Sequence, residues 1–181
     1  MSDASMRALI KTRLTAMGPA IGRVHDYERW TVRGDNFLTL FQDPATRKIF
    51  GWEITRRALR VQKVAMHRYK LIHRYVIRGY YGVEDAAATE KTVNALVDRI
   101  VLDFALTKLP GTQGEQLPEM TIKTMVFGHV LCHVAEIVLP EVVEIVVPEE
   151  APAQDLTGID IEYYLTPALD ELTDAQDNID L

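Results

Sequence analysis

The side chains best suited to binding a metal ion are His129, Cys132 and His133. Imidazole and thiolate groups are the usual zinc ligands, and a zinc site takes three or four of them. The surrounding residues are strong β-formers, and on a strand His129 and His133 share one face while Cys132 lies on the other. Two ligands on one face do not close a zinc site. We therefore interpret these residues as part of a sheet strand and predict no metal ion and no other cofactor.

A second candidate is His25 with Asp26 and Glu28, which have the chemistry of a proton donor and acceptor pair. The sequence around them supplies neither a nucleophile nor a partner that would orient the histidine. The GxGxxG and GxxxxGK phosphate loops, the GxSxG serine motif and the HExxH and CxxC metal motifs do not occur in the chain. We predict no catalytic residues and no enzyme activity, and an unrecognised site around His25 or His129 is kept as an alternative.

Basic side chains dominate residues 47–78, where ten Lys and Arg against one acid give a local charge of +9. Such a charge attracts phosphate, so a nucleic-acid-binding module is one interpretation. Tyr69 and Tyr75 fall on the apolar face of a predicted strand, away from the basic side chains, which disfavours base stacking. We favour a contact between subunits or with a partner protein, made by a charged loop at residues 56–66. The candidate interface residues are Arg56, Arg57, Arg60, Lys63 and Arg68.

Acidic side chains dominate the C-terminal part of the chain. No Lys or Arg follows Lys123, so the last 58 residues carry 13 acids, whereas the first 123 hold 20 bases and 13 acids. The acidic part is too apolar for a solvating tail and too charged for a core, which indicates a docking segment. Its partner is the basic part of the same chain, a neighbouring copy or another protein. Its candidate contact residues are Ile159, Ile161, Tyr163, Tyr164 and Leu165.

The 181 residues fit one α+β body at 1–139 and an acidic extension at 140–181. A single cysteine rules out a disulfide within the chain. The first residues lack the unbroken apolar run of a secretory signal, and no stretch approaches the ~18 apolar residues that span a bilayer. We therefore expect a soluble protein with no membrane partner.

Hydrophobic periodicity predicts a mainly antiparallel sheet covered by an N-terminal helix and one long helix. On the strand at 68–80, the face with Leu71, Tyr75 and Ile77 should be core, and the opposite face should meet solvent or a partner. An extended arm with a brief helix near Leu169 should follow. The expected elements are a helix at 6–17, a strand at 21–27, a short helix from 35, strands at 50–55 and 68–80, a helix at 84–108, a hairpin at 122–126 and 129–139, and an edge strand at 142–147.

Five clusters of residues, which together cover most of residues 20–139, resemble a family of structural proteins from Mu-like phage and prophage tail gene clusters. Their order is more specific than any one of them. The clusters are Val24-His25-Asp26-Tyr27-Glu28-Arg29-Trp30, Phe37-Leu38-Thr39-Leu40-Phe41, Gly51-Trp52-Glu53-Ile54-Thr55-Arg56, Arg78-Gly79-Tyr80-Tyr81-Gly82 and Gly128-His129-Val130-Leu131-Cys132-His133-Val134-Ala135-Glu136.

The resemblance implies a virion protein similar to the tail terminators of long-tailed phages. Those proteins form a hexameric ring that caps the tail tube and joins it to the head, with subunits packed by heterologous contacts. It further implies a tail tube protein and a head-side connector as partners, DNA that at most passes through the ring, and a place at the head–tail junction after assembly in the host cytoplasm. Another neck or head-completion connector is the nearest alternative. The acidic extension lies outside the resemblance.

Overall fold

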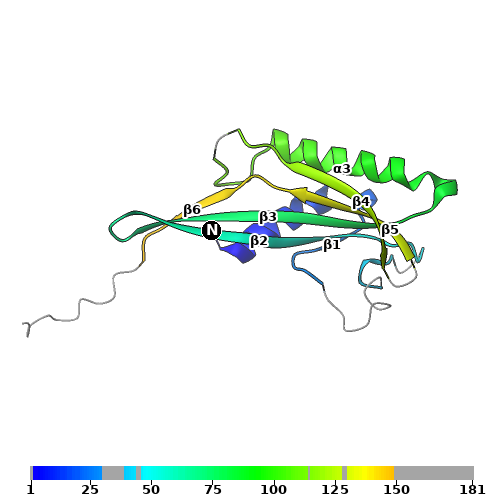
Figure 1. Ribbon diagram of the computed structural model, residues 1–181, viewed down its shortest axis with the longest axis horizontal. Coiled ribbons are helices and arrows are strands. Elements are labelled where there is room, and N and C mark those ends of the chain that lie inside the picture. The colour runs from blue at the N-terminus through cyan, green and yellow to red at the C-terminus, as the bar shows by residue number, and fades with distance from the viewer. Residues whose placement is uncertain (1, 30–38, 44–45, 114, 128–129, 149–181) are drawn as a thin grey trace, which may run out of the picture. The chain divides into compact units, whose positions relative to one another are not determined.

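The computed structural model describes residues 2–29, 39–43, 46–113, 115–127 and 130–148. Six strands form one sheet in the order β1-β2-β3-β5-β4, and β6 also pairs with β3 (Figure 1). All pairs are antiparallel except β1 with β2, which is parallel. The strands are β1 Arg23–His25, β2 Phe50–Ala65, β3 Arg68–Gly82, β4 Glu119–Phe127, β5 Val130–Val138 and β6 Val142–Val146.

Two long helices, α1 (Asp3–Ala16) and α3 (Thr89–Leu106), pack on one face of the sheet. Ser2 caps α1 by accepting a hydrogen bond from the Ser5 amide, and Gly18, at φ 99°, lies just beyond the helix end. Short 3-10 turns occupy Pro19–Ile21 and Asp85–Ala87. The α+β class and both helices are confirmed, although α3 begins later than 84 because the backbone is left-handed at Ala88.

The main core lies between the helices and the sheet. Side chains from α1 and α3 interlock with alternate residues of β2, β3 and β5, because successive strand residues point to opposite faces. Trp52, Ile54, Tyr75 and Ile77 are the central strand residues, each at most 3% exposed. Trp52 also donates from its indole nitrogen to the Ile21 carbonyl at 2.8 Å. The predicted core face of residues 68–80 is therefore confirmed.

The opposite face of the sheet carries a second, smaller core. Phe41, Ile49, Tyr80, Cys132 and Val134 form this cluster, and residues 39–41 are helical. The prediction that this face meets only solvent or a partner is wrong at Ile72, Val76 and Tyr80, which are 6%, 2% and 4% exposed. The rest of the short helix predicted from residue 35 lies outside the described residues.

The prediction of a loop at residues 56–66 is wrong. Strand β2 continues for 16 residues to Ala65, and only Met66 and His67 form the turn into the 15-residue β3. His67 has φ 56°, a left-handed conformation that histidine adopts more readily than most residues. Bulges after Arg56 and Lys63 interrupt the alternation of side chains along β2. The sequence of residues 56–65 therefore lacks the period of two that predicts a strand.

Strand β6 completes the first compact unit, which spans residues 1–147, and a second unit begins at Pro148. The predicted edge strand at 142–147 is confirmed as β6, which pairs with Tyr69–His73 of β3. The predicted hairpin of β4 and β5 is likewise confirmed. Strands β5 and β6 both run along the same edge of β3, so the chain turns aside only briefly at Leu139–Glu141.

Candidate functional site: a basic hairpin arm

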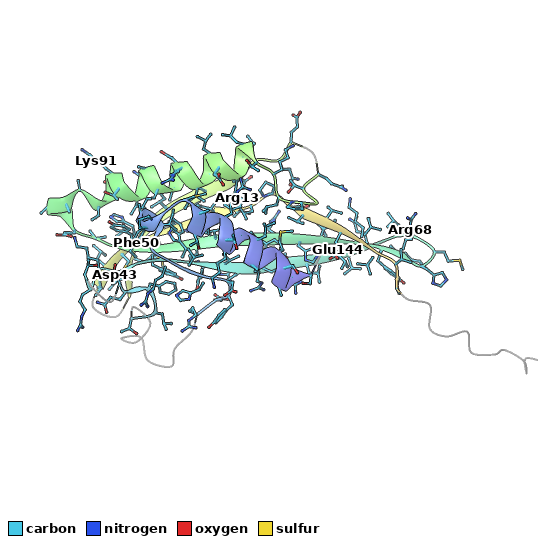
Figure 2. All side chains as sticks on the ribbon, turned by 180° about the vertical axis from the view of Figure 1, so that it is seen from behind. Arg13, Asp43, Phe50, Arg68, Lys91 and Glu144 are labelled. Atoms are coloured by element: carbon cyan, nitrogen blue, oxygen red, sulfur yellow. The ribbon has the colours of Figure 1, made fainter. Side chains whose placement is uncertain are left out.

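The distal halves of β2 and β3 form a hairpin that extends past both helices, and we call residues 56–74 the hairpin arm. Its turn lies at one end of the part of the chain that spans residues 1–147 (Figure 1), and Arg68 is far from Phe50 and Asp43 at the other end of that part (Figure 2). Every residue from Arg57 to Arg68 is exposed. The exposed apolar side chains include Leu59 at 45%, Val61 at 56%, Val64 at 58% and Met66 at 81%. A surface that is both apolar and charged suits a protein contact.

The arm contains all five basic residues predicted as an interface, and no Asp or Glu occurs between Glu53 and Glu84. Three of the five are paired within the chain, as Arg56 lies 3.7 Å from Asp3, Arg57 3.5 Å from Glu28 and Arg60 3.1 Å from Glu141. Lys63 and Arg68, beside the turn, form no ion pair with any residue that the structure describes. The unneutralised charge is thus concentrated at the tip.

The two edges of the hairpin arm differ. On the β3 side, β6 covers Tyr69 to His73. On the β2 side, β1 pairs only with Gly51, Trp52 and Glu53, and in the described ranges no strand pairs with β2 beyond that point. An open strand edge presents unpaired N–H and C=O groups and is a template for another strand.

An ionic network around the buried Glu53 carboxylate lies beside the base of the arm. Glu53 is 1% exposed and accepts hydrogen bonds from the Tyr80 hydroxyl at 2.9 Å and the Arg29 amide at 3.0 Å. Arg78 lies 3.7 Å from Glu53, 3.8 Å from Glu28 and 2.9 Å from Glu136. Burial raises the pKa of Glu53 above 4.5, and these hydrogen bonds oppose the rise. The sequence analysis missed this network, although a charged residue between Trp52 and Ile54 was a signal for it.

His73, like Thr55 and Thr112, has buried polar side-chain atoms that form no hydrogen bond with the described residues. It is 5% exposed, neither ring nitrogen has a hydrogen bond from the described residues, and Nε2 lies 3.6 Å from a Glu144 carboxylate oxygen. A hollow of about 310 Å³ beside it is lined by Met6, Tyr75 and the start of β6. The ionisable side chains that line the hollow are His73, Glu144 and Tyr75, and the Tyr75 hydroxyl donates to Asp3 at 3.0 Å.

The residues first considered for metal or acid–base chemistry do not converge. His133 packs in the main core, 3.3 Å from the Thr89 hydroxyl, while Cys132 lies in the opposite core, where burial raises the pKa of its thiol to about 11. His25 contacts the Leu40 carbonyl at 3.1 Å and Asp26 lies 3.4 Å from Lys11. His129 is outside the described residues. In the described part of the chain, no group of three His, Cys, Asp or Glu side chains could hold a metal ion.

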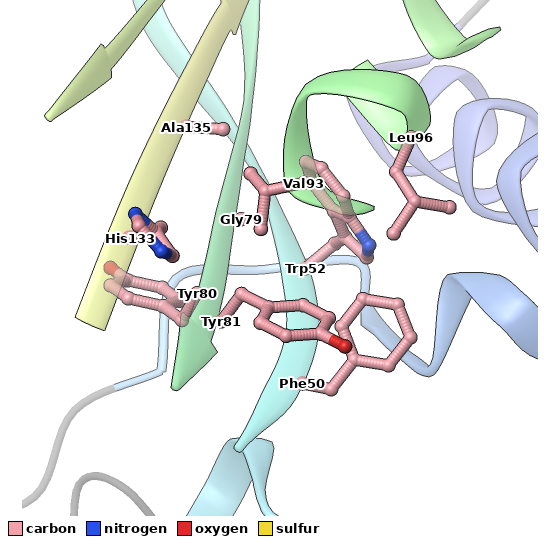
Figure 3. A pocket seen from close by; sticks show the side chains of 9 residues that line it. All are labelled: Phe50, Trp52, Gly79, Tyr80, Tyr81, Val93, Leu96, His133 and Ala135. Atoms are coloured by element: carbon pink, nitrogen blue, oxygen red, sulfur yellow. The ribbon is translucent and has the colours of Figure 1, made fainter. Parts of the chain in front are cut away.

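The aromatic cluster at the other end of the sheet is packed too closely to admit a ligand. Phe50, Trp52, Tyr81, His133 and Val93 surround it (Figure 3). Its free volume is about 10 Å³, roughly that of one water molecule. The cluster, which includes Gly79, Tyr80 and Tyr81 of the Gly-Tyr-Tyr-Gly run, is therefore part of the packed interior.

Comparison of the sequence with protein-family models and with curated proteins finds no match. None of the helices in the described ranges is long and apolar enough to cross a bilayer. The predicted contact residues of the acidic extension, Ile159, Ile161, Tyr163, Tyr164 and Leu165, lie outside the described residues, as does the helix expected near Leu169. The hairpin arm is thus the candidate site that the structure describes.

Proposed function

We propose that this chain is a phage virion structural protein, a tail terminator whose copies form a ring that caps the tail tube and joins it to the head. The hairpin arm is the observation that carries the proposal. On this projecting strand pair, Leu59, Val61 and Met66 are 45%, 56% and 81% exposed, so their apolar surface is available to a partner. Such a projection can reach a neighbouring subunit by a heterologous contact, which closes into a ring at a fixed number of copies. Six copies and a position at the head–tail junction follow from the resemblance of the residue clusters.

The ion pairs along the arm favour a protein partner over nucleic acid. Arg56, Arg57 and Arg60 already face carboxylates within the chain, which lowers the charge that phosphates would meet. Tyr75 is 1% exposed on the helix side, so it cannot stack on a base. By contrast, when another protein surface covers the apolar side chains near the turn, the free energy of the complex is lowered.

The mass of the full-length protein in solution, measured by light scattering over a range of concentrations with electron microscopy of the particles, tests the proposal. We expect ring-shaped oligomers, either alone or on the ends of tail tubes purified from the same virion. Met66→Asp at the arm tip should raise the dissociation constant of the ring at least about tenfold, which corresponds to 1.4 kcal/mol. Leu117→Asp, at a loop residue that is 65% exposed, is the matched control and should leave assembly unchanged.

Particles that stay monomeric at every concentration and do not bind tube ends would refute the ring. A ring with equal stability in Met66→Asp and Leu117→Asp would retain the assembly role and remove the arm from the interface. Salt-sensitive binding to DNA by a monomer would favour the nucleic-acid alternative instead.

A further inference from the structure

The hairpin arm exposes an open strand edge whose two sides differ in chemistry. Beyond Glu53, no strand from the described part of the chain pairs with the outer edge of β2. Leu59 and Val61 lie on the helix side of this edge, because their partners in β3 belong to the predicted core face, and they are 45% and 56% exposed. Arg60 lies on the other side. A strand added to this edge would form backbone hydrogen bonds and cover the two apolar side chains.

Strand β4 forms the opposite border of the sheet, and its outer edge is likewise unpaired within the described ranges. Its nine residues are comparable in length with the open part of β2 at residues 54–65. Met120 and Ile122 lie on the helix side, since they pair with Ile137 and Ala135 of the main core. Met120 is 42% exposed and Val126 is 65% exposed. The β4 edge therefore also combines an open backbone with apolar side chains.

The two open edges are compatible in direction. Strand β4 is antiparallel to β5, β5 to β3 and β3 to β2, so β4 and β2 run in opposite directions within one chain. Copies related by rotation about a ring axis keep the same face of the sheet outward. In such a ring, β4 of one copy meets β2 of the next as an antiparallel neighbour, and the helix side of one sheet continues into the helix side of the other.

Charge favours β4 over a second β2 edge as the occupant. A contact between two arms around a two-fold axis would bring Arg57, Arg60 and Lys63 of one copy close to the same residues of the other. Like charges on opposed strands destabilise the pair. Strand β4 instead carries one acid, Glu119, and one base, Lys123, so it adds no net charge to the contact.

We propose that the open edge of β2 in one copy binds the outer edge of β4 in a second copy, as an antiparallel strand pair. Leu59 and Val61 then lie against the helix-side residues of β4, because directly opposed residues share a face. Each copy offers one edge of each kind, so the contact is heterologous and repeats from copy to copy. This inference rests on the proposed function and names the surface that receives the hairpin arm.

Cysteine pairs placed across the contact test it in the full-length chain. Leu59→Cys is combined in turn with Met120→Cys, Ile122→Cys, Thr124→Cys or Val126→Cys, which all lie on the helix side of β4. Within one chain, β2 and β4 are three strand spacings apart, about 14 Å, whereas a disulfide requires Cα atoms within about 7 Å. A disulfide between the two positions therefore joins two copies.

We expect one of the four pairs to form covalent multimers larger than a dimer on mild oxidation, with at least about tenfold more product than the control pair. The control combines Leu59→Cys with Met125→Cys. Met125 is 46% exposed but lies on the other face of β4, opposite Cys132 of the second core. The parent chain gives the background from its own cysteine, and melting temperatures of the reduced variants verify that they are folded.

Rings of the parent chain, together with no product above the control in any of the four pairs, overturn the contact and leave the proposed function standing. Dimers from Leu59→Cys alone, in the same yield as from the pairs, assign the edge to a second arm and also overturn the contact. A parent chain that stays monomeric at every concentration and does not bind tube ends refutes the proposed function, and the contact fails with it.

Discussion

The close contact between Gly79 and Trp52 allows a direct test of how the sheet is packed. Gly79 of β3 lies opposite Trp52 of β2 on one side and Ala135 of β5 on the other. A Cβ at this position would meet three atoms of the indole ring, the farthest at 2.7 Å, well inside any normal contact. The ring is 3% exposed and its nitrogen donates to the Ile21 carbonyl, so it cannot turn away without loss of that bond. Figure 3 shows the ring within its cluster.

We expect Gly79→Ala to lower the free energy of unfolding by about 2 kcal/mol. Overpacking of a core costs roughly 1–3 kcal/mol, and displacement of the ring adds the loss of one hydrogen bond, about 0.5–1.5 kcal/mol. Replacement of glycine by alanine returns roughly 0.4–1 kcal/mol through the unfolded chain. For a chain of this size, 1 kcal/mol shifts Tm by about 2–4 °C, so the melting temperature should fall by about 4–8 °C.

Gly82→Ala in the same strand is the matched control. Its nearest neighbour would be the Ile49 Cβ at 3.8 Å, an ordinary contact, so this variant should be as stable as the parent or slightly more stable. Urea unfolding followed by circular dichroism gives both free energies. A second comparison introduces Gly79→Ala into Trp52→Phe, where the smaller ring should reduce the cost. Equal stability of the two alanine variants, or an equal cost of Gly79→Ala in both backgrounds, would falsify the steric explanation.

Three further predictions concern single side chains. Arg13→Met should lower the free energy of unfolding in urea by about 1.5–3 kcal/mol, because Arg13 binds the Asp103 carboxylate at 2.5 Å and two carbonyls at the end of α3. Lys11→Met removes a more exposed ion pair with Asp26 at 3.4 Å and should cost less than about 1 kcal/mol. A larger cost for Lys11→Met than for Arg13→Met would contradict this prediction. Burial raises the pKa of Glu53 in the folded protein above 4.5. The protonated form of Glu53 therefore contributes its full stability below pH 4.5, and this stability is lost as the pH rises through the pKa of Glu53 in the folded protein. Glu53→Gln should therefore flatten the fall of Tm above pH 4.5, and an unchanged slope would show that other groups cause it. Cys132 should react with a thiol reagent at pH 8 only after unfolding in guanidinium, since its pKa is raised to about 11; rapid reaction of the native protein would indicate local opening.

The elements with clear periodicity were predictable from the sequence. Leu71, Tyr75 and Ile77 share one face of residues 68–80, and the buried residues of α3 recur at helical spacing, so the α+β class and the covering helix followed from short-range patterns. The exposed half of β2 was not predictable in this way. Two bulges displace Arg57 and Val64 from the alternation, and the strand is held by its pairing with β3, a long-range interaction.

The candidate site was predictable in composition but not in geometry. The five basic residues were identified from local charge, and the structure places them on one arm. Their partners Asp3, Glu28 and Glu141 are distant in the sequence, and no local pattern links them to the arm. The Glu53 and Arg78 network was missed for the same reason, since cross-strand pairing creates it.

The chain passes from β5 to β6 at Leu139–Glu141, and Glu141 contacts both strands of the hairpin arm there. Glu141 holds Arg60 at 3.1 Å and Arg74 at 3.6 Å, one from each strand of the arm, close to where the helices cease to support the sheet. The nine residues of β2 beyond Arg56 extend over about 30 Å, so a rotation of about 10° at the base of the arm would move the tip by about 5 Å. Glu141 therefore links both strands of the arm through ion pairs to exposed arginines, and its replacement would remove both links at once.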